Sequence, residues 1–389
     1  MAAPKCTRPL RRACERFGHT GAVQAPPVDV ALAMLTLVPG AMGGSETYTR
    51  ALTRELAGSS EVNATAYVAA IGAGFSQGVP ERVVPGVHGG ASTRSRLATL
   101  VQAARRRREI RASWAEAAVV HYPFTAPVPR PVAPTAVVVS LLDVQHRDLP
   151  GLFSRAERAY RRRFYDAAAR RADVVVTISE FAKSRIVALL GIEPQRIVVA
   201  PLGVDASEFE PNLGPRENLL LYPARGWPHK NHAALFEAFS LLRAEDPTLR
   251  LVLTGGGLDG LGAVPAGVVV RGLVGRGELR ELYRTVAALV FPSLYEGFGL
   301  PPLEAMASGC PVAASRAGAL PEICGDAAVL FDAHRPEAIA AGVQEVLARS
   351  DDLRERGLAR ARAFTWAACA DAHVRAYRLA AAKPRGSMR

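Results

Sequence analysis

The feature of this sequence that most constrains its fold is a strand signal, a glycine loop and a helix start in immediate succession. The apolar run 287–291 is short and is ended by a proline, as expected of a strand buried on both faces. Gly297 and Gly299 follow, and after them come two prolines, which a helix tolerates in its first turn because those N–H groups lack intrahelical partners. We expect a short helix over 303–308, ended by Gly309.

Two carboxylates flank this predicted helix start. Glu296 precedes the glycine loop, and Glu304 lies eight positions later. The N-terminus of a helix attracts anions, since its free N–H groups and its partial positive charge face the same way. A single glutamate there is also a favourable helix-start charge with no further role. The pair, with glycines between its members, offers backbone donors for a phosphate or sugar oxygen and carboxylate acceptors for two hydroxyl groups, such as those of a ribose.

This block resembles the E-x7-E block of retaining glycosyltransferases of family 4, which are two-domain enzymes of the GT-B fold. The matching positions are 296–301, 304–307 and 309–312. The resemblance implies that Glu296 acts at the donor sugar or the reaction centre. It also implies a set of donor-binding residues: Gly297, Phe298, Gly299, Leu300 and Glu304.

The chain length and the strand pattern predict two domains. At 389 residues the chain is too long for one ordinary core. Apolar runs that alternate with helical stretches favour an α/β fold with a doubly wound parallel sheet. Together with the resemblance, this predicts two Rossmann-like domains of the GT-B fold that face a cleft. The predicted parts are a mobile basic tail (1–26), an N-terminal acceptor domain (27–205), a linker (206–216), a C-terminal nucleotide-sugar domain (217–365) and a helix that crosses back to the N-terminal domain (366–389).

A second strand, glycine loop and helix opens the N-terminal domain. The apolar run 28–38 leads to Gly43 and Gly44, after which 45–56 is expected to be a helix capped by Ser45. Glycine turns of this kind also make plain strand-to-helix connections, so the pattern alone is weak. The resemblance implies that Gly43 and Gly44 approach the donor phosphate and the acceptor across the cleft.

Two histidines and an aspartate near predicted strand ends are candidates for catalysis. His121 falls in the apolar run 117–122, and His146 lies in a polar loop together with Asp143. Ligands of doubly wound sheets bind beyond the carboxyl ends of the strands, where these loops would lie. Each histidine also has an ordinary alternative as a hydrogen-bonded packing residue.

The segment around these residues departs from its family at one position. Residues 140–162 resemble a subgroup of family 4 that includes mannosyl- and rhamnosyltransferases, in which a histidine usually precedes the aspartate and contacts the donor sugar and the reaction centre. Leu142 stands at that position here. The departure leaves open whether His146, His121 or neither residue takes the role.

Two cations share the loop that follows the predicted strand 219–222. Arg225 and Lys230 suit a diphosphate, because a guanidinium fork and an ammonium group together neutralise such a leaving group. A pair of surface cations is the alternative, but the strand-loop-helix setting favours binding, and the resemblance implies the same role. It also implies that Val274 lies near the nucleotide base.

We expect neither a metal ion nor a cofactor at this site. His229 and His232 have no third ligand nearby in the sequence, and no Asp-x-Asp pair lies in a predicted cleft loop. Basic side chains would then carry the charge that a metal otherwise supplies. The five cysteines are scattered and lack ligand spacing, which predicts a reduced, cytoplasmic protein without disulfides.

The formal net charge of +12 is carried mainly by arginine. Abundant arginine and alanine with little lysine is typical of a GC-rich genome, so we expect no nucleic-acid partner from the charge alone. Two arginine clusters, 105–108 and 155–171, would allow peripheral contact with an anionic membrane or a phosphate-bearing acceptor, or they form solvated basic faces. No apolar run spans a bilayer, and the basic start of the chain is not followed by a signal-peptide h-region, so any membrane contact is expected at the inner face of the membrane.

The predicted activity is transfer of a hexose, with mannose or rhamnose favoured, from a nucleotide-diphosphate sugar to a hydroxyl group with retention of configuration. The acceptor would be a small molecule, a glycan or a lipid-linked sugar. The alternatives are a catalytically inactive GT-B partner protein or a basic protein that binds nucleic acid or membrane. A GT-B epimerase normally lacks the glutamate block, a phosphorylase needs a pyridoxal lysine, and a dehydrogenase needs a G-x-G-x-x-G that residues 40–44 do not supply.

Overall fold

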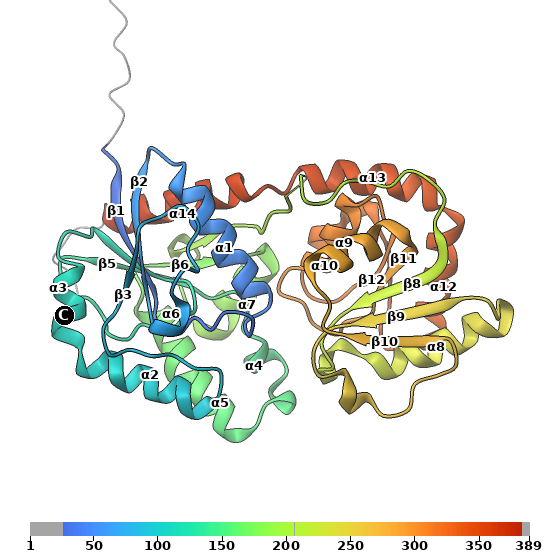
Figure 1. Ribbon diagram of the computed structural model, residues 1–389, viewed down its shortest axis with the longest axis horizontal. Coiled ribbons are helices and arrows are strands. Elements are labelled where there is room, and N and C mark those ends of the chain that lie inside the picture. Colours follow the sequence, from blue (N-terminus) through green and yellow to red (C-terminus); the bar gives the residue numbers. More distant parts are fainter. Residues whose placement is uncertain (1–25, 206, 383–389) are drawn as a thin grey trace, which may run out of the picture.

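The computed structural model describes residues 26–205 and 207–382, which form two α/β domains side by side (Figure 1). The predicted mobile tail, apart from Pro26, lies outside the described residues. So do Ala206 of the predicted linker and residues 383–389 of the predicted C-terminal segment.

The N-terminal domain is built on a seven-stranded parallel sheet in the order β3-β2-β1-β4-β5-β6-β7. Its strands are β1 (Val28–Met34), β2 (Val62–Val68), β3 (Glu81–Val83), β4 (Val119–Tyr122), β5 (Ala136–Ser140), β6 (Val174–Thr177) and β7 (Ile197–Val199). Its helices are α1 (Gly44–Ala57), α2 (Thr93–Arg105), α3 (Arg107–Ser113), α4 (Gln145–Asp148), α5 (Arg155–Arg161), α6 (Ala167–Arg171) and α7 (Glu180–Leu190), with a π-helical turn (Arg162–Asp166) between α5 and α6.

Helices cover both faces of this sheet, because alternate residues of a strand point to opposite sides. On β1, Leu32 and Met34 belong to a buried cluster that includes residues of α1. Ala31 and Ala33 belong to a second cluster on the other face, with residues of α3, α6 and α7. The sheet is therefore doubly wound.

The C-terminal domain is built on a six-stranded parallel sheet in the order β10-β9-β8-β11-β12-β13. Its strands are β8 (Glu217–Pro223), β9 (Arg250–Thr254), β10 (Val268–Gly272), β11 (Val286–Phe291), β12 (Val312–Ser315) and β13 (Val329–Phe331). Its helices are α8 (His232–Glu245), α9 (Arg276–Thr285), α10 (Leu300–Ala307), α11 (Leu320–Cys324), α12 (Pro336–Ala348) and α13 (Ser350–Arg362). Both sheets confirm the predicted pair of doubly wound, Rossmann-like domains.

Two predicted helix starts differ from the structure. Gly43 occupies the N-cap position of α1 with a positive φ of 57°, and no described side chain caps this helix, so the predicted Ser45 cap is wrong. α10 begins at Leu300, three residues earlier than predicted. The φ of 118° at Gly299 turns the chain sharply into the helix, and the two prolines then occupy its first turn.

The last helix, α14 (Trp366–Ala381), leaves the C-terminal domain and packs on the N-terminal one, against α1 and strands β5 to β7. Buried hydrogen bonds fix it there. His373 Nδ1 lies 2.8 Å from the Cys369 carbonyl oxygen, and Nε2 lies 2.6 Å from the Tyr48 hydroxyl of α1. Since a carbonyl oxygen only accepts, His373 carries its proton on Nδ1 and accepts from Tyr48 through Nε2.

The chain of hydrogen bonds continues through both central strands. The Tyr48 hydroxyl lies 2.8 Å from Ser140 Oγ of β5, and Ser140 Oγ lies 2.8 Å from His121 Nε2 of β4. His121 Nδ1 lies 2.9 Å from the Tyr377 hydroxyl, which returns the chain to α14. The donor directions follow one another: Tyr377 donates to His121, His121 to Ser140, and Ser140 to Tyr48.

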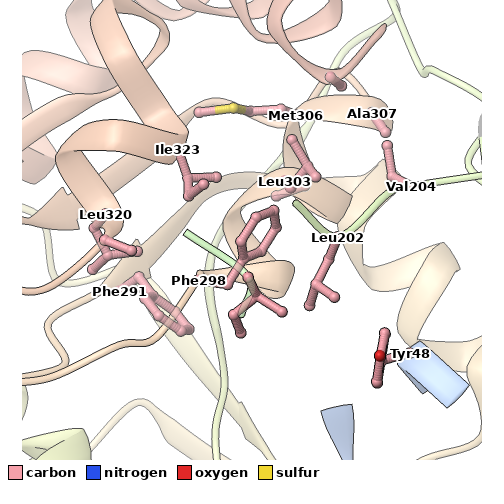
Figure 2. Close-up of a cluster of buried hydrophobic side chains, with 14 of the residues drawn as sticks. Tyr48, Leu202, Val204, Phe291, Phe298, Leu303, Met306, Ala307, Leu320 and Ile323 are labelled. Carbon is pink, nitrogen blue, oxygen red and sulfur yellow. The ribbon is translucent and has the colours of Figure 1, made fainter. Parts of the chain in front are cut away.

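The two segments that join the domains are bound to each other. Val204 N–H donates to the Phe364 carbonyl oxygen at 3.0 Å. Gly203 lies so close to the Thr365–Trp366 backbone that a Cβ at this position would overlap it. Leu202 and Val204 also continue the buried cluster from the N-terminal domain into the C-terminal one (Figure 2).

The buried chain predicts a loss of stability in mild acid. Burial lowers the pKa of His373 from its ordinary 6.5 to about 4, so the unfolded chain takes up a proton before the folded protein does. The contribution of this residue to the free energy of unfolding is complete above pH 6.5 and is lost as the pH falls toward 4, by at most about 3 kcal/mol.

His373→Gln should be less stable than wild type at neutral pH, because the chain is interrupted, yet lose less stability on acidification. Thermal unfolding at about pH 7.5 and about pH 5 checks this. The exposed His334→Gln is the control and should follow wild type. Equal acid losses in wild type and His373→Gln would contradict the assignment.

Candidate active site

The loops that follow the central strands of the two sheets meet between the domains. In each sheet the strand order reverses at this point, between β1 and β4 and between β8 and β11, where doubly wound sheets bind their ligands. A Cβ at Gly297 would lie 3.2 Å from the Leu142 carbonyl oxygen and 3.3 Å from Asp143 Cβ. A Cβ at Gly43 would lie 3.7 Å from Arg225 Nη2. The structure thus brings the two predicted glycine loops to opposite sides of one cleft.

Glu296 and Lys230 form an ion pair in this cleft. Lys230 Nζ lies 2.6 Å from Glu296 Oε1, and both side chains are largely buried. Lys230 Nζ also lies 5.7 Å from the centre of the Phe291 ring. The backbone of Glu296 is fixed as well, because its carbonyl oxygen accepts the Ala319 N–H at 3.0 Å. The predicted donor-sugar carboxylate and diphosphate lysine are therefore adjacent.

Arg225 differs from Lys230 in having no carboxylate partner. Its guanidinium lies 5.2 Å from the centre of the Trp227 ring, and no ion pair involves it within residues 26–205 and 207–382. Gly226 N–H donates to the Gly256 carbonyl oxygen at 3.0 Å, which fixes the loop that carries both cations. A half-buried guanidinium of this kind, beside a glycine loop of the other domain, is available to an anion.

The glycine loop before α10 is anchored by Phe298. The Phe298 side chain lies in the middle of the interdomain cluster, among Leu202, Leu303 and Ile323 (Figure 2), and is 3% exposed. The side chain of Phe298 therefore packs into the core, and its backbone stays part of the loop that is predicted to bind the donor. Gly297 and Gly299 lie in the loop that enters α10, and Leu300 is the first residue of the helix. Pro301 and Pro302 have no N–H group, so the backbone donors at this helix start belong to residues 297–300.

Glu304 lies one turn into α10 and is 8% exposed. Its Oε2 accepts a hydrogen bond from the Tyr283 hydroxyl at 3.0 Å. Burial raises the pKa of this carboxyl group from 4.5 to about 7, and the charge of Arg276 opposes that shift only in part. A group that is costly to ionise in the folded protein, at the start of a helix in a cleft, is typical of a ligand-binding carboxylate.

The structure does not bring His121 to the cleft. This residue, predicted as a catalytic candidate, has no exposed side-chain surface, and both of its ring nitrogens are engaged in the buried chain to α14. Burial, and the neighbouring His373, lower the pKa of His121 well below 6.5. The ordinary alternative of a packing histidine therefore holds for this position.

His146 is also buried, while Asp143 faces the cleft. His146 Nε2 lies 2.8 Å from Asp166 Oδ1, and Arg147 Nε donates to Asp166 Oδ2 at 2.7 Å. Asp143 is half-buried, accepts the Gln145 N–H at 3.0 Å and lies against Gly297. Of the three catalytic candidates on the N-terminal domain, Asp143 is the one that the structure places beside the glycine loop.

The remaining predicted residues lie on the segments that follow β1 and β10. Gly43 and Gly44 are exposed at the N-terminus of α1, opposite Arg225. Val274 is half-buried in the loop between β10 and α9. β10 is an edge strand and lies three strands away from β11 in this sheet. Val274 is therefore separated from the glycine loop that follows β11 by the ends of β8 and β9.

Sequence reasoning missed the residues that close the cleft. Tyr295 donates a hydrogen bond to Asp148 Oδ2 of the N-terminal domain at 3.0 Å. Glu322 accepts hydrogen bonds from the N-terminus of α7. In the sequence, Glu322 directly follows a proline at a helix start. This position is typical of an acidic residue that stabilises its own helix, so the sequence does not indicate the contact with α7.

Comparison with known proteins covers both domains. The family described as Glycosyltransferase Family 4 matches residues 42–208, and the family described as Glycosyl transferases group 1 matches residues 204–363. The chain is 34% identical over 235 residues to O-antigen chain mannosyltransferase B of Escherichia coli, which covers 54% of this chain and 61% of that protein.

Two further likenesses agree with this. The MMP alpha-(1->4)-mannosyltransferase of Mycolicibacterium hassiacum is 33% identical over 233 residues, which covers 55% of this chain and 56% of that protein. The chain therefore spans less than two thirds of the length of these curated relatives. The solved structure of sucrose-phosphate synthase from Thermosynechococcus elongatus matches with a TM-score of 0.74 at 21% identity, over 90% of this chain and 98% of that one. This last likeness shows the GT-B fold.

The raised pKa of Glu304 predicts that this residue destabilises the ligand-free protein. In the unfolded chain the carboxyl group ionises near 4.5, whereas in the folded protein it ionises near 7. The stability contribution is therefore present below pH 4.5 and is lost as the pH rises to 7. Glu304→Gln cannot ionise and should raise the free energy of unfolding at about pH 8 by up to about 3 kcal/mol, with no gain at acidic pH.

Glu296→Gln is the matched control, because the same substitution there breaks the ion pair with Lys230. It should lower the stability at about pH 8. Thermal and urea unfolding of both variants check the contrast. A Glu304→Gln variant that is no more stable than wild type at alkaline pH would show that ionisation of the buried carboxyl group does not destabilise the folded protein.

Proposed function

We propose, because the chain belongs to glycosyltransferase family 4, that it transfers a hexose from a nucleotide-diphosphate sugar to a hydroxyl group of an acceptor. The observation that carries this proposal is the arrangement of charge at the start of α10. There, Lys230 is paired with Glu296 directly before the glycine loop of α10. Arg225, which has no carboxylate partner among the described residues, lies beside Gly43 of the other domain. Such a site suits a diphosphate that leaves as its negative charge grows.

In this proposal Arg225 and Lys230 stabilise the departing diphosphate. The guanidinium of Arg225 offers two parallel N–H donors, and the backbone N–H groups of residues 297–300, at the start of α10, bind the same anion in this proposal. The ammonium group of Lys230 has further donors besides the one directed at Glu296, so it can bridge the carboxylate and a phosphate oxygen. Glu296 is then held against the sugar, where it stabilises the positive charge that develops at the anomeric carbon.

Glu304 is proposed to hold the ribose hydroxyl groups of the donor. Its carboxylate, once ionised, accepts hydrogen bonds from two neighbouring hydroxyl groups, which compensates for burial of the charge. The loop that would supply N–H donors to the diphosphate leads directly into the helix that carries Glu304, which fixes the spacing between the two parts of the donor.

Retention of anomeric configuration and independence from metal ions are further parts of the proposal. Retention rests on the family, and metal independence rests on the two cations at the diphosphate position. Mannose is favoured as the sugar because both relatives described above carry that sugar in their names. The acceptor is proposed to be a glycan or a lipid-linked sugar.

Contact with an anionic membrane is proposed for the solvent-facing side of α2. Leu97 and Val101 are 54% and 43% exposed, lie one helical turn apart, and line a shallow hollow. Arg94 and Arg105 bracket this apolar stripe at its two ends. Aliphatic side chains framed by arginines suit the headgroup region of an anionic bilayer. None of the described helices combines the length and the apolar content needed to cross a bilayer.

Arg225→Ala and Lys230→Ala should each lower kcat by on the order of 100-fold, because each removes charge stabilisation that is realised as the diphosphate leaves. The donor is first identified by thermal-shift screening with UDP, GDP, dTDP and ADP sugars. Turnover is then measured with the donor that stabilises the protein, with and without EDTA, and NMR coupling gives the anomeric configuration of the product. Near-normal turnover of both variants would refute the proposed role, and inversion or loss of activity in EDTA would refute the corresponding part of the mechanism.

The membrane proposal predicts binding to vesicles of phosphatidylglycerol and not to vesicles of phosphatidylcholine. The double substitutions Leu97→Ser with Val101→Ser and Arg94→Gln with Arg105→Gln should each weaken sedimentation with anionic vesicles by on the order of tenfold. Leu241→Ser is the control, since Leu241 is 45% exposed on α8 of the other domain. Unchanged binding by both double variants would contradict this surface.

A further inference from the structure

The two domains meet at the N-terminus of α7, and the group that occupies this N-terminus comes from the other domain. Glu322 of α11 accepts hydrogen bonds from the backbone N–H groups of Glu180 and Phe181, at 2.8 and 2.9 Å, one to each carboxylate oxygen. These are the first two N–H groups of α7, which have no partner within the helix. The third, that of Ala182, donates to Ser179 Oγ at 3.0 Å. The helix is therefore capped by both domains at once.

Ser179 connects the same helix start to the glycine loop. Its hydroxyl group donates to the Gly297 carbonyl oxygen at 2.7 Å while it accepts the Ala182 N–H. A serine hydroxyl has one proton to donate and lone pairs to accept with, so both bonds form together. The N-terminus of α7 thus touches the loop before α10 and the end of α11.

Glu322 is rigidly joined to Glu296. Gly318, with a φ of 62°, lies so close to Glu296 that a Cβ there would overlap its backbone. The N–H of the next residue, Ala319, donates to the Glu296 carbonyl oxygen. Glu322 lies one helical turn further on, and Arg360 of α13 braces that turn by donating to the Ile323 carbonyl oxygen at 2.9 Å. Movement of Glu322 relative to the N-terminal domain therefore moves Glu296 with it.

A second cross-domain contact lies beside the cap. Tyr295, adjacent to Glu296, donates to Asp148 Oδ2, and Arg185 of α7 donates to Asp148 Oδ1 at 2.9 Å. The ring of Tyr295 stands edge-on to that of Phe181, with 5.7 Å between the ring centres. Residues on either side of the cap are thus packed against each other as well as hydrogen-bonded.

We propose that Glu322 is a positioning residue, which sets the closed arrangement of the domains by capping α7 across the cleft and so holds Glu296 opposite Asp143. In an open arrangement the two N–H groups and the carboxylate would all be hydrated, and closure replaces that water by charge-assisted hydrogen bonds at a positive helix end. A single helix cap changes an equilibrium only modestly. The contact therefore favours closure and still permits the opening that exchange of substrate and product requires.

The two capped amides report on this contact directly. In Glu322→Ala, hydrogen exchange at Glu180 and Phe181 should become faster by on the order of tenfold, while exchange in the central strands β4 to β6 stays as in wild type. Mass spectrometry of the peptide over 178–184 measures this in the full-length, ligand-free protein. Glu322→Gln, which keeps the size but offers one acceptor, should give an intermediate rate.

The matched control is Glu337→Gln. Glu337 is also an acidic residue in the first turn of a C-terminal-domain helix, α12, and is exposed. It should leave exchange at 178–184 unchanged. Exchange in Glu322→Ala equal to that of wild type would overturn the proposal, and so would faster exchange that extends through the central strands, since that would indicate general unfolding.

The consequence for turnover rests on the proposed function and is measured separately. With the donor found by thermal shift, Glu322→Ala should lower kcat while the Kd for the nucleoside diphosphate stays within about twofold, because Arg225, Lys230 and Glu304, which are proposed to hold the diphosphate and the ribose, all lie on the C-terminal domain. An equal loss of affinity would refute the positioning role. If no nucleotide binds at all, the proposed function fails, and the exchange experiment still decides whether Glu322 holds the domains together.

Discussion

The arrangement of the cleft depends on how closely backbone approaches backbone around Glu296. Gly318 presses against this residue from one side, and Gly297 directly after it presses against Leu142 and Asp143 of the other domain. A Cβ at Gly318 would overlap the backbone of Glu296, and a Cβ at Gly297 would be close enough to Leu142 and Asp143 that these residues would have to shift. The carboxylate of Glu296 is consequently placed by contacts of its backbone, and Lys230 then fixes the direction of its side chain.

The features of the fold that could be predicted are those that depend on neighbours in the sequence. β11, the glycine loop and α10 were visible because a buried strand, a positive-φ glycine and a helix start each have a local signature. The predicted start of α10 lies three residues after the observed one. The sequence does not show that Gly299 by itself turns the chain into the helix. The predicted Ser45 cap was wrong for a similar reason, because the glycine before the helix already supplies the required backbone conformation.

The features that could not be predicted depend on residues far apart in the chain. His121 has the same surroundings in the sequence as a cleft histidine, and only its contact with Tyr377, 256 positions away, shows that it is a packing residue. Phe298 stands between two glycines of a loop, a position that suggests exposure, yet it is buried beside Leu202 and Phe364 of the two segments that join the domains. Glu322 looks like a charge for its own helix and instead caps a helix of the other domain. Leu142 stands where the family usually has a histidine, and its backbone carbonyl oxygen lies against Gly297.

The packing of α14 also has a consequence for the order in which the protein can be completed. The chain is made from its N-terminus, and domains generally fold as they emerge. Here the first domain contains Tyr48, Ser140 and His121, whose partners His373 and Tyr377 lie on the last helix of the chain. Until that helix is synthesised, these polar groups have to be satisfied by water within an unfinished core. The domain that is translated first is therefore the one whose interior is closed last.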